Sequence, residues 1–143
     1  EGGRELIAGG AVLAAAYLCG MAEQTRDDSV AHASTRVQYG TRIGAFQAVK
    51  HRCSDMAVRA EMAWAQTAFA ALRGSTFDAS AAKVVAVDAA VQNARANVQN
   101  HGGMGFTAEH DAHLFLKRAH IVEQFFGAPR WHLGEVLAAD LPW

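Results

Sequence analysis

The sequence predicts an all-α protein, an up-and-down helical bundle, and three observations carry this prediction. Proline is almost absent: Pro129 and Pro142 are the only two in 143 residues, so most of the chain contains no strong helix breaker. Alanine is abundant throughout, and it has the highest intrinsic helix propensity. No stretch alternates apolar and polar residues in the manner of a β-strand.

The first two helices are long. The first is expected from about Arg4 to Gln38, with Gly40 as its C-terminal stop. Its early part is apolar on all sides, as in a buried helix. The second is expected from near Gly44 to Gly74. One face carries a seam at alternating spacings of three and four: Phe46, Val49, Cys53, Met56, Ala60, Ala63 and Thr67.

The third helix is expected to be capped by Ser75, Thr76 or Asp78 and to stop at 101–103. It repeats the seam rhythm at Val84, Val87, Val91, Ala94 and Val98. A fourth helix from about Thr107 to Ala119, with Thr107 as N-cap, and a last helix from about Ala128 to Ala139 complete the chain. Short connections make the three long helices antiparallel neighbours, so we expect a single domain over residues 1–143.

The composition narrows the class of protein. Hydrophobic residues make up 51% of the chain, and 13 basic and 14 acidic residues give a net charge of −1. This balance disfavours a nucleic-acid partner. Residues 6–22 are nearly uncharged, but they are too short and too rich in Ala and Gly for a membrane span, so none is expected. Cys19 and Cys53 are expected to be buried thiols of a reducing compartment, which favours a cytoplasmic location.

Two glycine-containing turns offer chemistry. In the first, Arg36 ends one helix and Gln47 begins the next. A guanidinium fork and the free N–H groups of a helix N-terminus suit a phosphate. The alternative is that Arg36 pairs with a carboxylate and Gln47 caps its own helix. The second turn, 99–106, has three glycines within four positions, which would let its backbone approach a ligand closely. The alternative is that this turn is only a flexible connector between two helices.

Together the two turns resemble a known family. The segments RVQYGTRIGAFQAVKH and, about fifty residues further along, QNHGGMGFTAEHDAHLFLKRA are similar to the C-terminal domain of acyl-CoA dehydrogenases. The matching patterns are Arg-x-x-(Phe/Tyr)-Gly-x-x-Ile-x-x-Phe-Gln and Gln-x-x-Gly-Gly-x-Gly-(Tyr/Phe). The likeness runs from about Arg4 to the last helix, roughly the last third of such an enzyme.

The resemblance implies a cofactor and an assembly. These enzymes bind FAD at a subunit interface, so Arg36 and Gln47 would contact its pyrophosphate and adenosine side. The residues Gln99, Asn100, His101, Gly102 and Gly103 would contact FAD from the neighbouring subunit. The substrate would be an acyl-CoA thioester of lipid metabolism. The apolar first helix further predicts a dimer or tetramer through the long helices, a homo- or hetero-oligomer of dehydrogenase-like subunits.

The sequence departs from the family at the catalytic base. The resemblance places Phe126 where a glutamate removes the α-proton, and Gly10 where some members carry the base on the first helix. Neither can accept a proton. Glu123 is the nearest candidate, or it is a surface residue paired with Lys117 or Arg130. We therefore expect the chain alone to be inactive, and a catalytically silent assembly module is the alternative function.

The remaining conspicuous residues predict structural roles. His110 and His113 have the i, i+3 spacing of metal ligands, but no carboxylate pair or cysteine cluster accompanies them, so no metal site is expected. His110 and its neighbours Glu109 and Asp111 are expected to cap the short helix. The tryptophans are expected in packing or at an interface: Trp64, Trp131 and Trp143.

Overall fold

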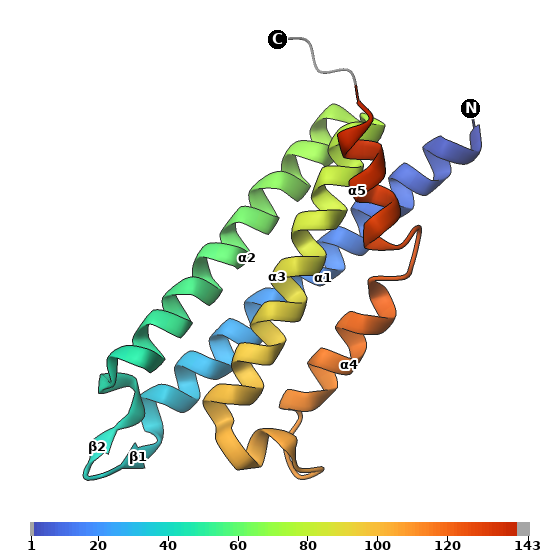
Figure 1. Cartoon of the computed structure of the whole chain (residues 1–143). Coiled ribbons are helices and arrows are strands. Elements are labelled where there is room, and N and C mark those ends of the chain that lie inside the picture. Colours follow the sequence, from blue (N-terminus) through green and yellow to red (C-terminus); the bar gives the residue numbers. More distant parts are fainter. Residues whose placement is uncertain (1, 140–143) are drawn as a thin grey trace.

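The computed structural model describes residues 2–139, which form five α-helices joined by short connections (Figure 1). The three long helices run antiparallel to their neighbours in the chain: α1 (Gly2–Thr35), α2 (Gln47–Arg73) and α3 (Thr76–His101). The shorter α4 (Ala112–Val122) and α5 (Pro129–Leu137) follow. The prediction of an all-α bundle is confirmed.

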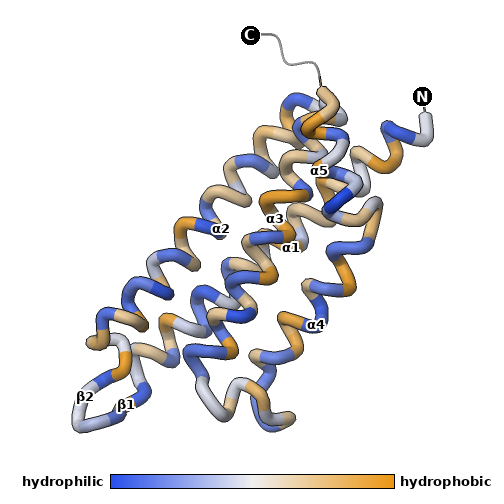
Figure 2. The backbone as a smooth tube through the Cα atoms, in the orientation of Figure 1, coloured by the Kyte–Doolittle hydropathy of each residue, from blue (hydrophilic) through white to orange (hydrophobic). Residues whose placement is uncertain are grey.

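The central helix is α3, which packs against each of the other four helices. Most of its circumference is buried, including three asparagines and a lysine, and beyond its first residue only a narrow stripe with Asp88, Arg95 and Gln99 is exposed. The sequence predicted all-round burial for the early part of α1 instead, and that prediction is wrong, since Leu6 and Leu13 are 74% and 71% exposed. Helices rich in alanine look alike in sequence, and only the neighbours around them decide which one is enclosed. Figure 2 accordingly shows hydrophobic positions on every helix.

The core consists mainly of small side chains. Alanines dominate the buried cluster that α1, α2, α3 and α4 share. Small side chains let helix backbones approach closely and still fill the space between them. The predicted seam of α2 is buried at Met56, Ala60, Ala63 and Thr67, while Phe46 is exposed and Val49 and Cys53 are half-buried. In the seam of α3 only Val84 is half-buried, and the other members are buried.

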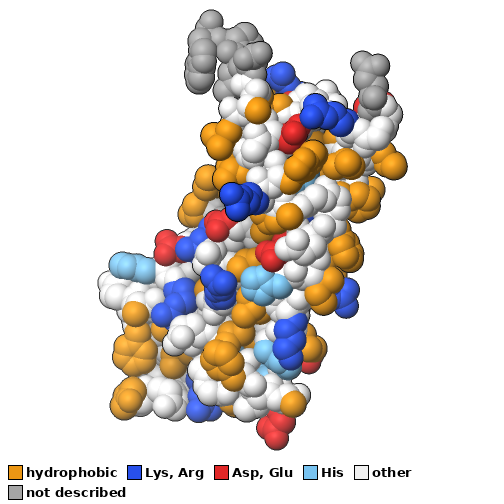
Figure 3. Space-filling model, turned by 45° about the vertical axis from the view of Figure 1, so that its right-hand side comes forward, with side chains coloured by type: hydrophobic (Ala, Val, Ile, Leu, Met, Phe, Trp, Pro, Cys, Tyr) orange, Lys and Arg blue, Asp and Glu red, His pale blue; other side chains and the backbone are white. Residues whose placement is uncertain are grey.

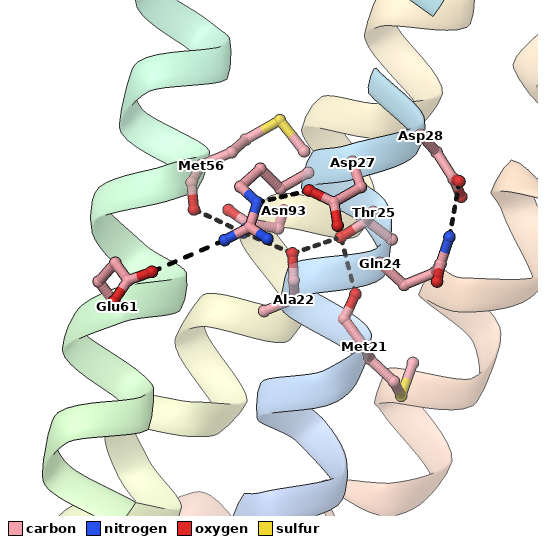
Figure 4. Close-up of polar contacts among 10 residues, drawn as sticks. Met21, Ala22, Gln24, Thr25, Asp27, Asp28, Met56, Glu61 and Asn93 are labelled. Atoms are coloured by element: carbon pink, nitrogen blue, oxygen red, sulfur yellow. Dashed lines mark hydrogen bonds and ion pairs between the residues drawn. The ribbon is translucent and has the colours of Figure 1, made fainter. Parts of the chain in front are cut away.

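A buried amide links the three long helices. The side chain of Asn93 on α3 donates hydrogen bonds to the carbonyl oxygens of Ala22 on α1, at 3.1 Å, and Met56 on α2, at 2.9 Å (Figure 4). Beside it, the Thr25 hydroxyl donates to the carbonyls of Met21 and Ala22. Because a buried polar group without partners is costly, these bonds favour one register of the helices over others.

The connection between α1 and α2 is a small β-hairpin. Strands β1 (Val37–Gln38) and β2 (Thr41–Arg42) pair antiparallel, and a 3-10 turn (Ile43–Ala45) follows. Tyr39 and Gly40 have φ of 52° and 76°, the left-handed pair that a two-residue hairpin requires. Helix α1 therefore ends three residues before the expected Gln38, Gly40 is a hairpin residue rather than a helix stop, and the expectation of no strand fails here.

Most other helix ends agree with the sequence, but α4 does not. Gly74 ends α2 with φ of 67°, and the Ser75 hydroxyl accepts the Asp78 N–H at the start of α3. The expected start of α4 at Thr107 is wrong, because the Thr107 hydroxyl donates to Met104 and closes a 3-10 turn (Gly102–Phe106). Helix α4 begins five residues later, where the His110 ring accepts the Ala112 N–H. It extends to Val122, beyond the expected Ala119, and α5 is slightly shorter than expected.

The burial of individual residues bears on the predictions for a membrane span, for the two thiols and for the tryptophans. By length and composition α1 could cross a membrane, but 44% of its apolar window is buried inside the bundle, and a core helix passes the same test. Cys19 is buried, with its Sγ 3.4 Å from the Thr67 hydroxyl, whereas Cys53 is only half-buried. Trp64 and Trp131 are partly exposed, and Trp143 lies outside the described residues.

Candidate functional site

The two glycine turns lie at the same end of the bundle, which we call the hairpin end: residues 32–47 and 97–110 (Figure 1). Side chains connect them across space. The His32 ring on α1 lies 4.2 Å from the His101 ring at the end of α3, measured between ring centroids. The Arg52 guanidinium on α2 donates to the Asn100 amide oxygen at 2.7 Å. All seven predicted cofactor-contacting residues therefore belong to this end.

Three of those seven present exposed polar side chains: Arg36, Gln47 and Gln99. Within residues 2–139 no ion pair or hydrogen bond engages the Arg36 guanidinium, so the carboxylate pairing considered as the alternative does not occur there. Gln47 is the first residue of α2, and the N-cap residue Phe46 forms no side-chain cap. A free guanidinium and an uncapped helix N-terminus therefore flank the same hairpin, and both kinds of donor suit an anion.

The glycines of the second turn leave its surface open. Gly102 has φ of 61° and ψ of −139°, a conformation that favours glycine, and Gly103 is exposed beside it. A Cβ added at either position would meet nothing within 4 Å. A ligand group such as a phosphate can therefore approach the backbone of this turn closely.

The other two candidates point inward. Asn100 is 7% exposed, and its amide also donates to the sulfurs of Cys53 and Met56, at 3.7 and 3.9 Å. His101 is equally buried, and its Nδ1 donates to the Asn97 carbonyl at 2.9 Å. These two residues shape the turn from beneath, while Gln99 stands on its outer side.

A stack of three histidine rings closes the hairpin end. The rings of His32, His101 and His110 follow one another with centroids 4.2 Å apart. Desolvation lowers the pKa of His32, and the neighbouring His101, Arg36 and His110 lower it further. Of the three residues predicted to cap α4, the His110 ring does so, whereas the N-cap residue Asp111 forms no side-chain cap; His113 donates to the His110 carbonyl. No group of three metal-ligating side chains suitable for an ion occurs among residues 2–139.

The two positions that the resemblance associates with the catalytic base lie at the opposite end and are in contact. The Phe126 ring covers Gly10 of α1: a Cβ built on Gly10 would lie 2.1 Å from Phe126 Cδ1. A side chain at position 10 and a side chain at position 126 would therefore occupy the same point in space. In this chain a phenyl ring occupies that place, and position 10 has room for it only because it is glycine.

Two buried side chains that the sequence analysis missed hold the connection carrying Phe126. Lys83 is fully buried, and its Nζ donates toward backbone carbonyls of residues 122–127, the shortest at 2.6 Å to Phe125. His132 lies 3.0 Å from the Phe126 carbonyl and 3.0 Å from the Ser80 hydroxyl. Burial lowers the pKa of both groups. The only signal in the sequence was a lysine inside an apolar helix.

Glu123, the weak candidate for a base, is engaged locally. Its carboxylate accepts from the His120 ring at 3.2 Å and from the Gln124 amide at 3.3 Å. The predicted partners Lys117 and Arg130 are wrong, because the last turn of α4 places His120 three residues before Glu123 on the same face.

Comparisons with known proteins agree with the family resemblance and the fold. The family described as "Acyl-CoA dehydrogenase, C-terminal domain" matches residues 4–139. Acyl-CoA dehydrogenase FadE34 of Mycobacterium tuberculosis is 44% identical over 129 residues, covering 85% of this chain and 18% of the relative. Acyl-CoA dehydrogenase IpdE2 of the same organism is 41% identical over 120 residues, covering 84% and 38%. The structure of butyryl-CoA dehydrogenase from Megasphaera elsdenii superposes with a TM-score of 0.90 at 29% identity, covering 94% of this chain and 36% of that one.

Proposed function

The chain belongs to the acyl-CoA dehydrogenase C-terminal domain family, and on that premise we propose that it is the C-terminal helical domain of an FAD-dependent acyl-CoA dehydrogenase-like oxidoreductase. Its contribution would be part of the FAD site and an oligomer interface. The reaction, α,β-dehydrogenation of acyl-CoA thioesters, belongs to the proposal, since the chain spans only 18% and 38% of the length of two curated relatives that it matches.

The hairpin end fits the diphosphate part of FAD. Arg36 would supply a fixed fork of donors, Gln47 would supply an amide, and the first turn of α2 would supply free N–H groups. Gln99 and the glycine turn would contact FAD from the neighbouring subunit. Asn100 and His101 would keep the glycine turn in shape from beneath. When bound, FAD supplies the acceptor for the hydride that leaves the acyl chain. The residues of this chain would bind and orient it.

A second apolar stripe on α2 supports the proposed oligomer interface. It lies on the face opposite the core, and its members are exposed at spacings of four and three: Val58, Met62, Ala65, Phe69 and Leu72. Met62 is 60% exposed and Leu72 is 87% exposed. This spacing is the seam by which one helix packs along another, so a second dehydrogenase-like subunit is the proposed partner. On the face that carries α4 and α5, hydrophobic side chains also reach the surface (Figure 3).

The contact of Phe126 with Gly10 carries a second candidate function, that of a catalytically silent subunit. Removal of an α-proton needs a base within hydrogen-bond reach of that proton. Both positions that could present one are occupied by residues without a basic group, and Glu123 is bound to His120. In this proposal a partner subunit supplies the glutamate, and this chain supplies the scaffold.

Turnover measurements test the silent-subunit proposal. The purified 143-residue chain, given FAD, an electron acceptor and a panel of acyl-CoA thioesters, is expected to show no turnover. The same assay on the purified flavoprotein homomer that contains this domain, without a partner subunit, is also expected to show none. Robust homomer turnover that disappears in Glu123→Gln would identify Glu123 as the base. Robust turnover that survives Glu123→Gln would overturn the silent-subunit proposal.

Flavin retention tests the FAD site separately. In the flavoprotein that contains this domain, Arg36→Ala removes a charge-assisted contact of about 1.5–3 kcal/mol and should release flavin. Arg130→Ala, which removes an exposed arginine of α5 at the other end of the bundle, is the matched control and should retain it. Flavin absorbance after gel filtration measures the occupancy. Equal occupancy in the two variants would remove Arg36 from the site.

A further inference from the structure

The connection between α4 and α5 has an unusual backbone. Phe126 has φ of 57° and Gly127 has φ of 107°, two consecutive residues in the left-handed half of conformational space. A phenylalanine rarely adopts such a φ, because its Cβ then crowds its own backbone. The surrounding structure must therefore hold this segment in place.

The first restraint comes from Lys83 on α3. Its Nζ lies 2.6 Å from the Phe125 carbonyl oxygen, 3.2 Å from that of Glu123 and 3.4 Å from that of Gly127. No carboxylate in the described part of the chain forms an ion pair with this ammonium. The carbonyl oxygens around the C-terminal end of α4 carry partial negative charge and replace a counter-ion.

The second restraint comes from His132 on α5. A carbonyl oxygen can only accept, so Nε2 carries the hydrogen that it donates to the Phe126 carbonyl at 3.0 Å. In the neutral ring, Nδ1 then accepts from the Ser80 hydroxyl at 3.0 Å. The hydrogen bonds run in one direction, from Ser80 through His132 to the peptide of residue 126, and they fix the tautomer of the ring.

The two restraints act together on three successive carbonyls. Lys83 holds those of Phe125 and Gly127, and His132 holds the one between them. Ser80 and Lys83 lie one turn apart on α3, so one helix face supports both. None of these contacts uses the phenyl ring. The backbone that aims residue 126 at Gly10 is therefore fixed independently of the side chain that it carries.

We propose that Lys83, His132 and Ser80 are positioning residues that hold the side chain of residue 126 over Gly10, whichever residue stands there. The chain thus keeps the support of a base position while carrying a phenylalanine in it. The significance of that position rests on the proposed function, whereas the positioning itself does not. A Phe126→Glu chain should accordingly keep the same backbone at residues 125–127 and place its carboxyl group over Gly10.

The test uses the full chain labelled with 4-fluorophenylalanine, with the ¹⁹F signal of Phe126 assigned by its loss in Phe126→Leu. In Lys83→Met, which keeps the length of the side chain but removes the ammonium, we expect the Phe126 signal to shift or split. The control is Ser29→Ala, which removes a buried hydroxyl that donates to Asn97 at 2.8 Å at the hairpin end. It should leave the Phe126 signal unchanged.

A milder variant keeps the proposal testable if Lys83→Met does not fold. Ser80→Ala removes only the donor to His132, and it should change the ¹⁵N shifts of that ring from the Nε2–H pattern and move the Phe126 signal. A thermal shift with an unchanged Phe126 signal in the folded variants would overturn the proposal and leave a structural role alone. The turnover assay tests the proposed function, whereas these NMR signals test the positioning alone, so either proposal can fail without the other.

Discussion

Two aromatic–glycine pairs, one at each end of the molecule, share positive φ angles and differ in what holds them in that conformation. Tyr39–Gly40 forms the tip of the hairpin, and Phe126–Gly127 lies in the connection before α5. All four residues have positive φ, and Tyr39 and Phe126 are the only non-glycine residues among residues 2–139 that do. The hairpin pair is held by its own strands, in which Val37 pairs with Arg42.

The second pair is held from outside, by side chains of α3 and α5. Tyr39 is 95% exposed, whereas the Phe126 ring lies on Gly10 and the Phe126 carbonyl accepts from His132. A locally held turn at the surface can change its residues and adapt to a ligand. A turn held by the core cannot change its residues or its conformation without disturbing the packing of three helices. The hairpin end is therefore suited to binding, and the connection end is suited to holding one side chain in a fixed place.

The largest contrast is expected from alanine at the two glycines. The Cβ added by Gly40→Ala has no atom within 4 Å, so this variant should lose only about 1–2 kcal/mol of unfolding free energy, the cost of a left-handed backbone at a non-glycine residue. A Cβ on Gly127 would lie 2.9 Å from His132 Nε2 and from the Trp131 ring. Gly127→Ala should therefore add an overpacking cost of about 1–3 kcal/mol to the same penalty. Urea unfolding gives both free energies, and equal losses of stability would contradict the difference in packing between the two turns.

The next contrast concerns the two adjacent glycines of α1. Gly9→Ala meets nothing within 4 Å and should stabilise the helix by about 1 kcal/mol. Gly10→Ala collides with the Phe126 ring and should destabilise the chain by about 1–3 kcal/mol. Because the clash needs both partners, the cost of Gly10→Ala should fall sharply in a Phe126→Ala background. A double-mutant cycle without coupling would contradict the contact.

Acid is expected to weaken both ends, through one histidine at each. Burial lowers the pKa of His132 at the connection end and of His32 at the hairpin end below the ordinary 6.5. Below pH 6.5 the unfolded chain takes up protons that the folded chain does not, so the free energy of unfolding should fall until the pH reaches the lowered values. Above pH 6.5 these two groups contribute no slope. Urea unfolding at a series of pH values measures the effect.

Added inorganic phosphate separates the two histidines. An anion held near Arg36 would stabilise the imidazolium of His32 and raise its pKa, whereas His132 is enclosed between α3 and α5 and should not respond. Ring titrations followed by NMR report each pKa. A response of both rings, or of neither, would remove the distinction between a binding end and a holding end.

The smallest effect is expected at the tip of the hairpin. Tyr39→Asn should stabilise the chain by up to about 1 kcal/mol, because asparagine tolerates the left-handed conformation and the exposed ring contributes no packing. Phe126→Asn relieves the same backbone strain but removes the ring from Gly10, and it should produce no gain. Thermal unfolding of the two variants compares them directly.

The sequence contained enough to predict the helices but not their environments. Gly74 and Gly102 end their helices as predicted, because a glycine that adopts positive φ directly after a helix is a local signal. The hairpin was missed since two-residue strands show no periodicity and its turn is Tyr-Gly rather than Asn-Gly. The exposure of α1 could not be read either, because alanine-rich helices have no distinct polar face.

The candidate site was predictable to the extent that it is helical. Asn93, Asn97, Asn100 and His101 follow the periodicity of one α3 face, so the inward direction of the last two was available from their spacing, as was the outward direction of Gln99. The contact of Gly10 with Phe126 was not, since it joins the first helix to the connection between the last two helices. Lys83 and His132 act on one connection only once α3, α4 and α5 have packed together.

The two ends of the described chain lie close together. The Arg4 guanidinium on the first turn of α1 is 3.6 Å from the Glu135 carboxylate on α5, and the hairpin lies at the opposite end of the bundle (Figure 1). A circular permutant is therefore feasible: a short glycine linker would join α5 to α1, and new termini would open between Tyr39 and Gly40. Such a chain would keep every helix–helix contact while cutting the one turn that supports itself, so it would separate the folding of the bundle from the integrity of its binding end.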